Sequence, residues 1–382
     1  MGRGSYPAVV NFEGSLGACV VSWSWASSTQ SAAQTSSIST TTSEMNVQSF
    51  SPATPVTHSS FVRAGDAEPS NSPVSCCTRD GTVLEGRTNE TRSMLRDFLD
   101  RLGYQDPQTP LNPRLRNEAA DDIESWGVGL SKQIIEGLVD TACSIAESAY
   151  AHLPYEHQLF IALYTAHFVY VDDLGNRDLE SLGQFHRRYA TREDMPDPVL
   201  GRIVQQFRDM YRLYPRLSAD AIIAGSLETL IGMYIEYATK NVPAVPGATM
   251  YAPFLRQKTA DGLAYAFFNF VKGWRDPSDT YHLHVMPALD RLTQTINDIL
   301  SFYKEIVRGE NDTYIGLQAA AAKKDPHVVL REVIEETFTL IRMVEDLTAN
   351  DAELAAICKS YVMGYVEFHV RAGRYCLGEI LA

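Results

Sequence analysis

Cysteine is scarce in this chain of 382 residues, and the six that occur form neither a metal-binding C-x-x-C pair nor the ladder of a disulfide-rich scaffold. We therefore expect a reducing compartment, the cytoplasm, in which Cys143, Cys358 and Cys376 pack in the core. Long hydrophobic runs are missing as well. The strongly apolar stretch 157–174 is shorter than the ~20 residues that span a bilayer, so we expect a buried helix there and no membrane span.

Positive charge is also in short supply. Lys and Arg number 33 against 47 Asp and Glu, which leaves a formal net charge of −14. This balance argues against nucleic acid as a partner, because a nucleic-acid-binding surface needs an excess of cations. An anionic ligand would have to be held by local cations or by a bound metal ion.

Sustained strand alternation is absent, and the pattern from residue 88 onward is helical, which predicts an all-α bundle. Residues 1–87 differ, because Ser and Thr dominate much of this segment and it cannot bury enough apolar surface to fold. We predict a disordered tail over 1–87 and one helical domain over 88–382. The helices are expected at residues 94–102, 117–126, 131–150, 157–174, 198–214, 219–237, 252–271, 281–307, 327–348 and 352–381.

The stretch 297–305, N-D-I-L-S-F-Y-K-E, carries the clearest chemical signal. Asn297, Ser301 and Glu305 are spaced at i, i+4 and i+8, so a helix places their oxygens on one face. An amide, a hydroxyl and a carboxylate suit a hard divalent cation, of which Mg²⁺ is the commonest. Lys304 adds a cation beside them. The alternative is an ordinary, half-exposed helix that carries a few polar residues.

A second signal is the acidic pair Asp172-Asp173 at the end of the apolar stretch. Phe168 and Tyr164 precede Asp172 by one and two helical turns, which places aromatic rings beneath a carboxylate inside a bundle. Carboxylates there need a compensating cation. The alternative is a helix that simply ends in solvent, with Gly175 as the residue that follows its last turn.

Two cationic segments complete the set. Arg374-Tyr375 offers a forked cation and a phenol on the expected last helix, a pair suited to an oxyanion such as diphosphate. Arg256 and Lys258 lie upstream of Asp261, and either could contact the same anion. We favour Arg256. Each of these segments, taken alone, also fits an ordinary solvated surface.

The order of these motifs resembles the fungal sesquiterpene cyclases of the trichodiene synthase type. The resemblance rests on the acidic pair, the N-D-x-x-S-x-x-K-E stretch, the segment from Gly364 to His369 and the final R-Y, and it covers roughly residues 88–382. It implies a class I terpene synthase fold around a central apolar cavity. It also implies a homodimer that cyclises farnesyl diphosphate in secondary metabolism.

The resemblance also implies roles for the site residues. Three Mg²⁺ ions would clamp the diphosphate, with Asp172 as ligand on one side and Asn297, Ser301 and Glu305 on the other. The diphosphate oxygens would be bound by Arg256, Lys304, Arg374 and Tyr375, and Asp173 would support Asp172 in a less defined role.

The chain also departs from the family pattern. Leu174-Gly175-Asn176 stands where further carboxylates are usual, and the spacing from Arg256 to Asp261 is longer than expected. These departures suggest a product other than trichodiene, such as a longiborneol-like alcohol. Three alternatives stay open: a prenyl diphosphate synthase, a non-catalytic helical binding protein, and a cyclase for geranyl or geranylgeranyl diphosphate. The first should carry a second aspartate-rich motif, which this chain lacks.

Overall fold

The computed structural model describes residues 81–240 and 242–381, in which every regular element is a helix. The prediction for residues 1–80 lies outside this part, and residues 81–87 of the predicted tail form the beginning of α1. The elements are α1 (Gly81–Leu102), α2 (Pro113–Glu124), α3 (Lys132–Ser148), α4 (Tyr155–Arg177), α5 (Leu179–Thr191), α6 (Pro198–Leu213), α7 (Arg216–Thr239), α8 (Tyr251–Thr259), α9 (Gly262–Phe267), η1 (Tyr281–His284), α10 (Met286–Arg308), α11 (Tyr314–Ala322), α12 (Pro326–Thr348), α13 (Ala352–Arg371), η2 (Gly373–Tyr375) and α14 (Gly378–Leu381).

Local sequence explains where many of these helices begin and end. The side chains of Asn112 and Asp197 cap α2 and α6, each followed by a proline at the first helical position. Gly103 and Gly309 adopt positive φ directly after α1 and α10, a conformation that glycine reaches at low cost. These glycines explain why the helix ends expected at residues 102 and 307 lie within one residue of the observed ends, Leu102 and Arg308.

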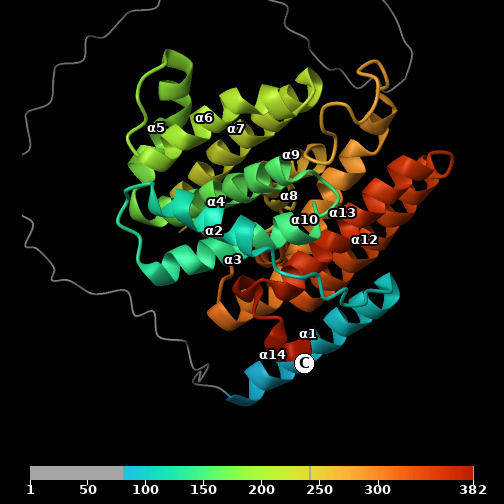
Figure 1. Ribbon diagram of the computed structural model, residues 1–382. Coiled ribbons are helices and arrows are strands. Elements are labelled where there is room, and N and C mark those ends of the chain that lie inside the picture. The colour runs from blue at the N-terminus through green and yellow to red at the C-terminus, as the bar shows by residue number, and fades with distance from the viewer. Residues whose placement is uncertain (1–80, 241, 382) are drawn as a thin grey trace, which may run out of the picture. The chain divides into compact units, whose positions relative to one another are not determined.

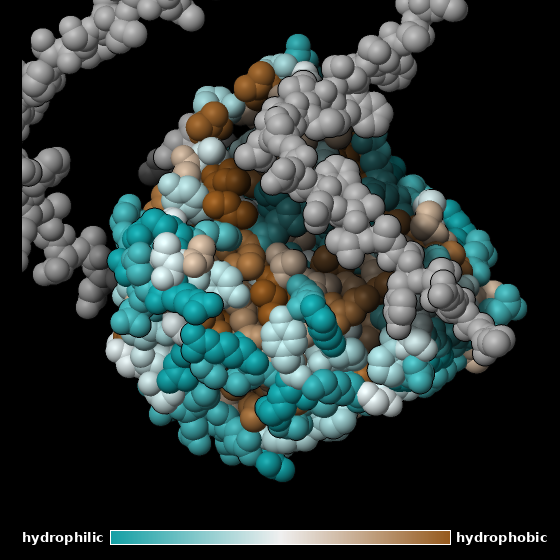
Figure 2. Space-filling model, turned by 90° about the horizontal axis from the view of Figure 1, so that it is seen from above, coloured by the Kyte–Doolittle hydropathy of each residue, from teal (hydrophilic) through white to brown (hydrophobic). Residues whose placement is uncertain are grey.

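The core is a bundle in which α4 and α10 are the central helices (Figure 1). α3 packs on α4, while α10 packs on α9, α12 and α13. Helix α4 is buried over most of its length, which explains its nearly continuous apolar sequence. From above, the molecule is hollowed, with hydrophobic residues on the walls of the hollow (Figure 2). None of the helices in the described residues has the length and hydrophobicity that a membrane crossing requires.

Three expectations about the elements are wrong, and two helices were not expected. The helix expected at 252–271 is two short helices, because Asp261 has a φ of +51° and interrupts the helical conformation between α8 and α9. The helix expected at 352–381 ends at Arg371. The one expected at 281–307 begins as the 3₁₀ helix η1. Helices α5 and α11 were not predicted.

Candidate active site

One cavity of about 530 Å³ lies among the helices and collects most of the residues that the sequence singled out. Its walls come from α3, α4, α7 to α11 and α13, together with the turn that follows α13. Eight carboxyl groups and five cations line it. The carboxyl groups belong to Asp172, Asp173, Glu236, Asp261, Asp298, Glu305, Glu310 and Asp312, and the cations to Lys240, Arg256, Lys304, Arg308 and Arg374.

The carboxylate of Asp172 is held by two partners. Its Oδ2 lies 3.1 Å from a guanidinium nitrogen of Arg374, and its Oδ1 accepts a hydrogen bond of 3.0 Å from the hydroxyl of Tyr237. This bears out the need for a compensating cation at the end of α4. Asp173 also lines the cavity but is exposed.

Gly175 does not end α4, which was the alternative reading of this segment. The helix continues to Arg177, and Gly175 is buried inside it. A Cβ at this position would lie 2.8 Å from Cγ of Tyr237 and closer still to other atoms of the ring. The missing side chain therefore makes room for the tyrosine that binds Asp172.

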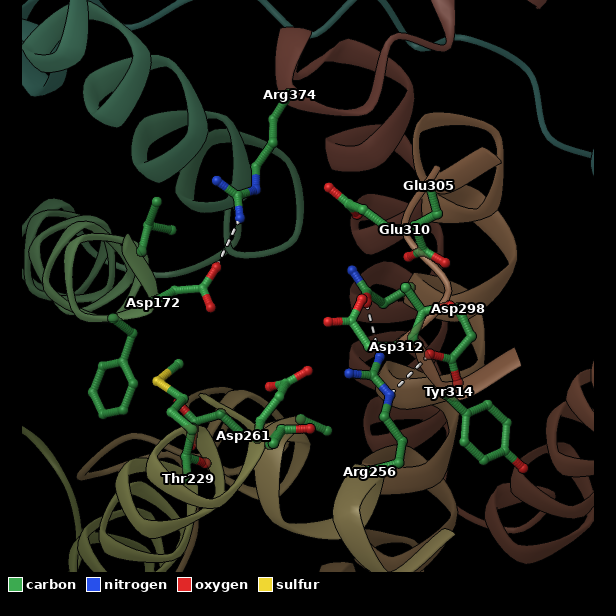
Figure 3. A pocket seen from close by; sticks show the side chains of 18 of the residues that line it. Asp172, Thr229, Arg256, Asp261, Asp298, Glu305, Glu310, Asp312, Tyr314 and Arg374 are labelled. Carbon is green, nitrogen blue, oxygen red and sulfur yellow. Dashed lines mark hydrogen bonds and ion pairs between the residues drawn. The ribbon is translucent and has the colours of Figure 1, made fainter. Parts of the chain in front are cut away.

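The oxygen-bearing face of α10, formed by Asn297, Ser301 and Glu305, lies across the cavity from Asp172, as the position of Glu305 shows (Figure 3). Asn297 and Glu305 line the cavity directly. Ser301 lies behind them and donates a hydrogen bond of 2.5 Å to Glu305 Oε1. Burial raises the pKa of Glu305, and the nearby cation of Lys304 opposes that rise. A bound cation would offset the cost of burying this carboxylate.

Arg256 and Lys258 differ in what they contact. Arg256 lines the cavity, where its Nε lies 2.9 Å from the carboxylate of Asp298 and its Nη2 donates to Asn297 Oδ1 at 2.8 Å. Lys258 pairs with Glu228 on α7, 2.6 Å away, and is not among the lining residues. The structure thus favours Arg256 as the cation available to a ligand.

Arg374 and Tyr375 reach the cavity from the 3₁₀ turn η2 and not from a helix, which corrects the expectation for this segment. The backbone N–H of Gly373 donates to Asp140 on α3 at 3.2 Å, which ties the turn to the bundle. The hydroxyl of Tyr375 is buried, and burial raises its pKa to about 12, so the phenol keeps its proton at neutral pH. It can therefore donate a hydrogen bond to an anion.

Aromatic side chains also line the cavity. They are Phe168, Tyr265 and Phe368, of which Phe168 was expected from its place one turn before Asp172. Tyr164 instead stands behind Phe168, with the ring centroids 4.5 Å apart, and its hydroxyl donates to Asp261 at 2.5 Å. Electron-rich ring faces of this kind attract positive charge.

Sequence reasoning missed several residues of the cavity, and three of them bear directly on the site. Burial raises the pKa of Glu236, with a contribution from Asp172, to about 7, and burial likewise raises the pKa of Asp298 to about 7. Tyr237 is the third. Asp298 stands in the quoted N-D motif, so its position could have been noted, whereas no local signal marks Glu236 or Tyr237.

Comparison with known proteins agrees with this geometry. The family described as trichodiene synthase (TRI5) matches residues 119–382. The chain belongs to the trichodiene synthase family. Two relatives come from Postia placenta: terpene synthase 29 is 30% identical over 82% of this chain and 90% of its own length, and monoterpene synthase 25 is 28% identical over 78% and 89%. Longiborneol synthase of Gibberella zeae is 28% identical over 60% of this chain and 69% of its own length.

The fold of this trichodiene synthase family member also has solved counterparts. Linalool/nerolidol synthase from Streptomyces clavuligerus superposes with a TM-score of 0.54 at 14% identity, over 71% of this chain and 99% of that one. The predicted all-α class I terpene synthase fold is thereby confirmed. Membership of the family identifies the protein as a terpene synthase.

Proposed function

We propose that the protein is a sesquiterpene synthase that ionises farnesyl diphosphate with the aid of Mg²⁺ and cyclises the resulting allylic cation. One observation supports this most: Asp172 and Glu305, which belongs to the oxygen-bearing face of α10, lie on opposite sides of one cavity (Figure 3), and aromatic side chains line the same cavity. A diphosphate would bind between the two polar sides, and its apolar chain would lie against the rings.

The donor set fits the cation. We propose Asn297, Ser301 and Glu305 as ligands from one face of α10, where Asn297 and Glu305 line the cavity and the hydroxyl of Ser301 donates to Glu305, and Asp172 as the ligand across the cavity. Among the described residues no three His, Cys, Asp or Glu side chains gather closely enough to hold a metal by themselves. A site on α10 would thus combine one carboxylate with neutral oxygens, as Mg²⁺ accepts when substrate phosphates complete its shell. We propose three ions, which would stabilise the departing diphosphate when bound.

The protein side chains have separate tasks in this scheme. Arg256, Lys304, Arg374 and Tyr375 would bind diphosphate oxygens, with Asp173 beside Asp172 at the entrance. Phe168 and Phe368 exclude water and face the hydrocarbon, so that positive charge can migrate without being captured. The released diphosphate can accept the final proton.

Two alternatives are weaker on these observations. A prenyl diphosphate synthase would need a second aspartate-rich motif where this chain has Asn297 and Ser301. A non-catalytic bundle would not need cations and carboxylates on both sides of one cavity. A shorter substrate has a specific observation in its favour, since one relative is called a monoterpene synthase. The homodimer and the cytoplasmic location stay predictions, as does a longiborneol-like product.

The test is incubation of the purified protein with farnesyl, geranyl or geranylgeranyl diphosphate and Mg²⁺, followed by gas chromatography–mass spectrometry. We expect a cyclic C15 product from farnesyl diphosphate that disappears when the metal is chelated. A cyclic product from another diphosphate alone would correct the substrate. Absence of any product, with correctly folded protein, would overturn the proposal.

A further inference from the structure

An asparagine that serves as a metal ligand must present one particular end of its amide. The oxygen of Asn297 can bind a cation, whereas the NH₂ group would repel it. In the structure Oδ1 lies 2.8 Å from a guanidinium nitrogen of Arg256, and Nδ2 lies 3.0 Å from Nε2 of His369. Because a guanidinium can only donate, the end of the amide that faces Arg256 has to be the oxygen.

The tautomer of His369 makes the second contact equally specific. Its Nδ1 lies 2.8 Å from the backbone carbonyl oxygen of Tyr365, one turn earlier on α13. A carbonyl can only accept, so Nδ1 carries the hydrogen and Nε2 of the neutral ring is the acceptor. Nε2 therefore accepts a hydrogen bond from the NH₂ group of Asn297 and cannot accept one from its oxygen.

The imidazole is held rigidly in this orientation. His369 has no exposed surface, so water cannot replace either contact. Three aromatic rings surround it, with centroids 4.6 Å (Tyr365), 4.7 Å (Phe368) and 4.3 Å (Tyr375) from that of the imidazole. Rotation of the ring would require all three to move.

We propose that His369 is a positioning residue that fixes the amide of Asn297 with its oxygen toward the cavity, ready for a divalent cation. This inference rests on the proposed function. A cation at Oδ1 would replace the hydrogen bond from Arg256, so the contact with His369, with the hydroxyl of Tyr375 beside the same amide, would keep the amide from flipping. Partners of metal ligands commonly act in this way, and their loss weakens metal binding about 10- to 100-fold.

The experiment measures the binding of Mg²⁺ together with inorganic pyrophosphate by isothermal titration calorimetry. We expect His369→Leu to weaken the binding about 10- to 100-fold. His369→Gln, whose side-chain oxygen can accept the same hydrogen bond, is expected to restore most of it. The apparent KM for Mg²⁺ should rise more than that for the prenyl diphosphate, a split that a general loss of packing would not produce.

A change of background isolates the orienting role. In Asn297→Asp both side-chain oxygens can bind a cation, so no orientation is needed and the lone pair of His369 faces a carboxylate oxygen. We expect His369→Leu to leave binding unchanged or better in that background. An equal loss of binding in both backgrounds would overturn the inference, because it would reveal a purely structural effect.

Wild-type controls separate the two proposals. If the folded wild type binds no Mg²⁺ with pyrophosphate, the proposed function fails and the inference falls with it. If the wild type binds and His369→Leu binds equally well, the inference alone is overturned. Should His369→Leu not fold, the ¹⁵N shifts of the imidazole, assigned against His369→Gln, decide the matter in the wild type: hydrogen on Nδ1 is expected, and hydrogen on Nε2 would refute the inference.

Discussion

Gly364 lies where α13 crosses the end of α3, and its replacement by alanine offers a quantitative test of the packing. A Cβ at Gly364 would lie 2.6 Å from Cα of Ala149 and 2.7 Å from the carbonyl carbon of Ser148. Carbon atoms in good contact are about 3.5 Å apart, so the two helices would have to separate by about 1 Å. Both obstacles are backbone atoms, which cannot rotate away as a side chain could.

The size of the effect follows from two opposing terms. Alanine stabilises a helix interior by about 1 kcal/mol relative to glycine, whereas overpacking a core costs about 1–3 kcal/mol. Gly364→Ala should therefore lower the free energy of unfolding by up to about 2 kcal/mol. Gly201 provides the matched control, because it lies within α6 and an added Cβ there meets no atom within 4 Å. Gly201→Ala should be stabilised by up to about 1 kcal/mol.

Urea denaturation followed by far-UV circular dichroism measures both variants against the wild type. The gap between the two variants cancels the helix-propensity term and reports overpacking alone, about 1–3 kcal/mol. Turnover should fall as well, because α3 and α13 carry cavity residues and a shift of about 1 Å can cost about 10²-fold in rate. If Gly364→Ala were as stable as Gly201→Ala, the close packing of α13 on α3 would be refuted.

Three further outcomes are expected. Asp172→Ala and Glu305→Ala should each reduce product formation by at least about 100-fold with unchanged circular dichroism, and wild-type rates would refute the metal assignment. Burial raises the pKa of Asp261 to about 8, against about 4 in the unfolded chain, so the free energy of unfolding should fall as pH rises between these values. Asp261→Asn, which can still accept from Tyr164, should flatten that decline in pH-dependent denaturation, and an unchanged slope would contradict it. Removal of residues 1–80 leaves α1 whole and should preserve both Tm and turnover, whereas loss of either would show that this segment contributes to the fold.

Much of the fold could be predicted because the signals are local. A continuous apolar run predicted the buried helix α4, and α6 begins at Pro198 as expected, where the side chain of Asp197 caps it. The spacing of Asn297, Ser301 and Glu305 was enough to place three oxygens on one face of α10, since helix geometry alone decides it.

The remainder depends on contacts between distant segments. The segment 252–271 was expected to form one helix, and its break at Asp261 reflects two neighbours: Tyr164, which binds the carboxylate, and α10, which Gly262 approaches so closely that a Cβ would lie 2.7 Å from the carbonyl oxygen of Asp290. The bond from Tyr237 to Asp172 spans 65 residues. Periodicity cannot reveal such pairs, because it reports which face of a helix is buried and not what lies against that face.

The balance of carboxyl groups and cations in the cavity has a consequence for the order of events. Eight carboxyl groups and five cations line the cavity, and burial raises the pKa of three of the carboxyl groups, those of Asp261, Glu236 and Asp298, to about 7 or 8. The other five carboxyl groups equal the cations in number, so a diphosphate that arrives without metal meets no excess of positive charge. Under the proposed function, the metal ions and the substrate would therefore bind strongly only in each other's presence. The reactive carbocation would then be generated only after both the metal ions and the diphosphate substrate have bound in the cavity.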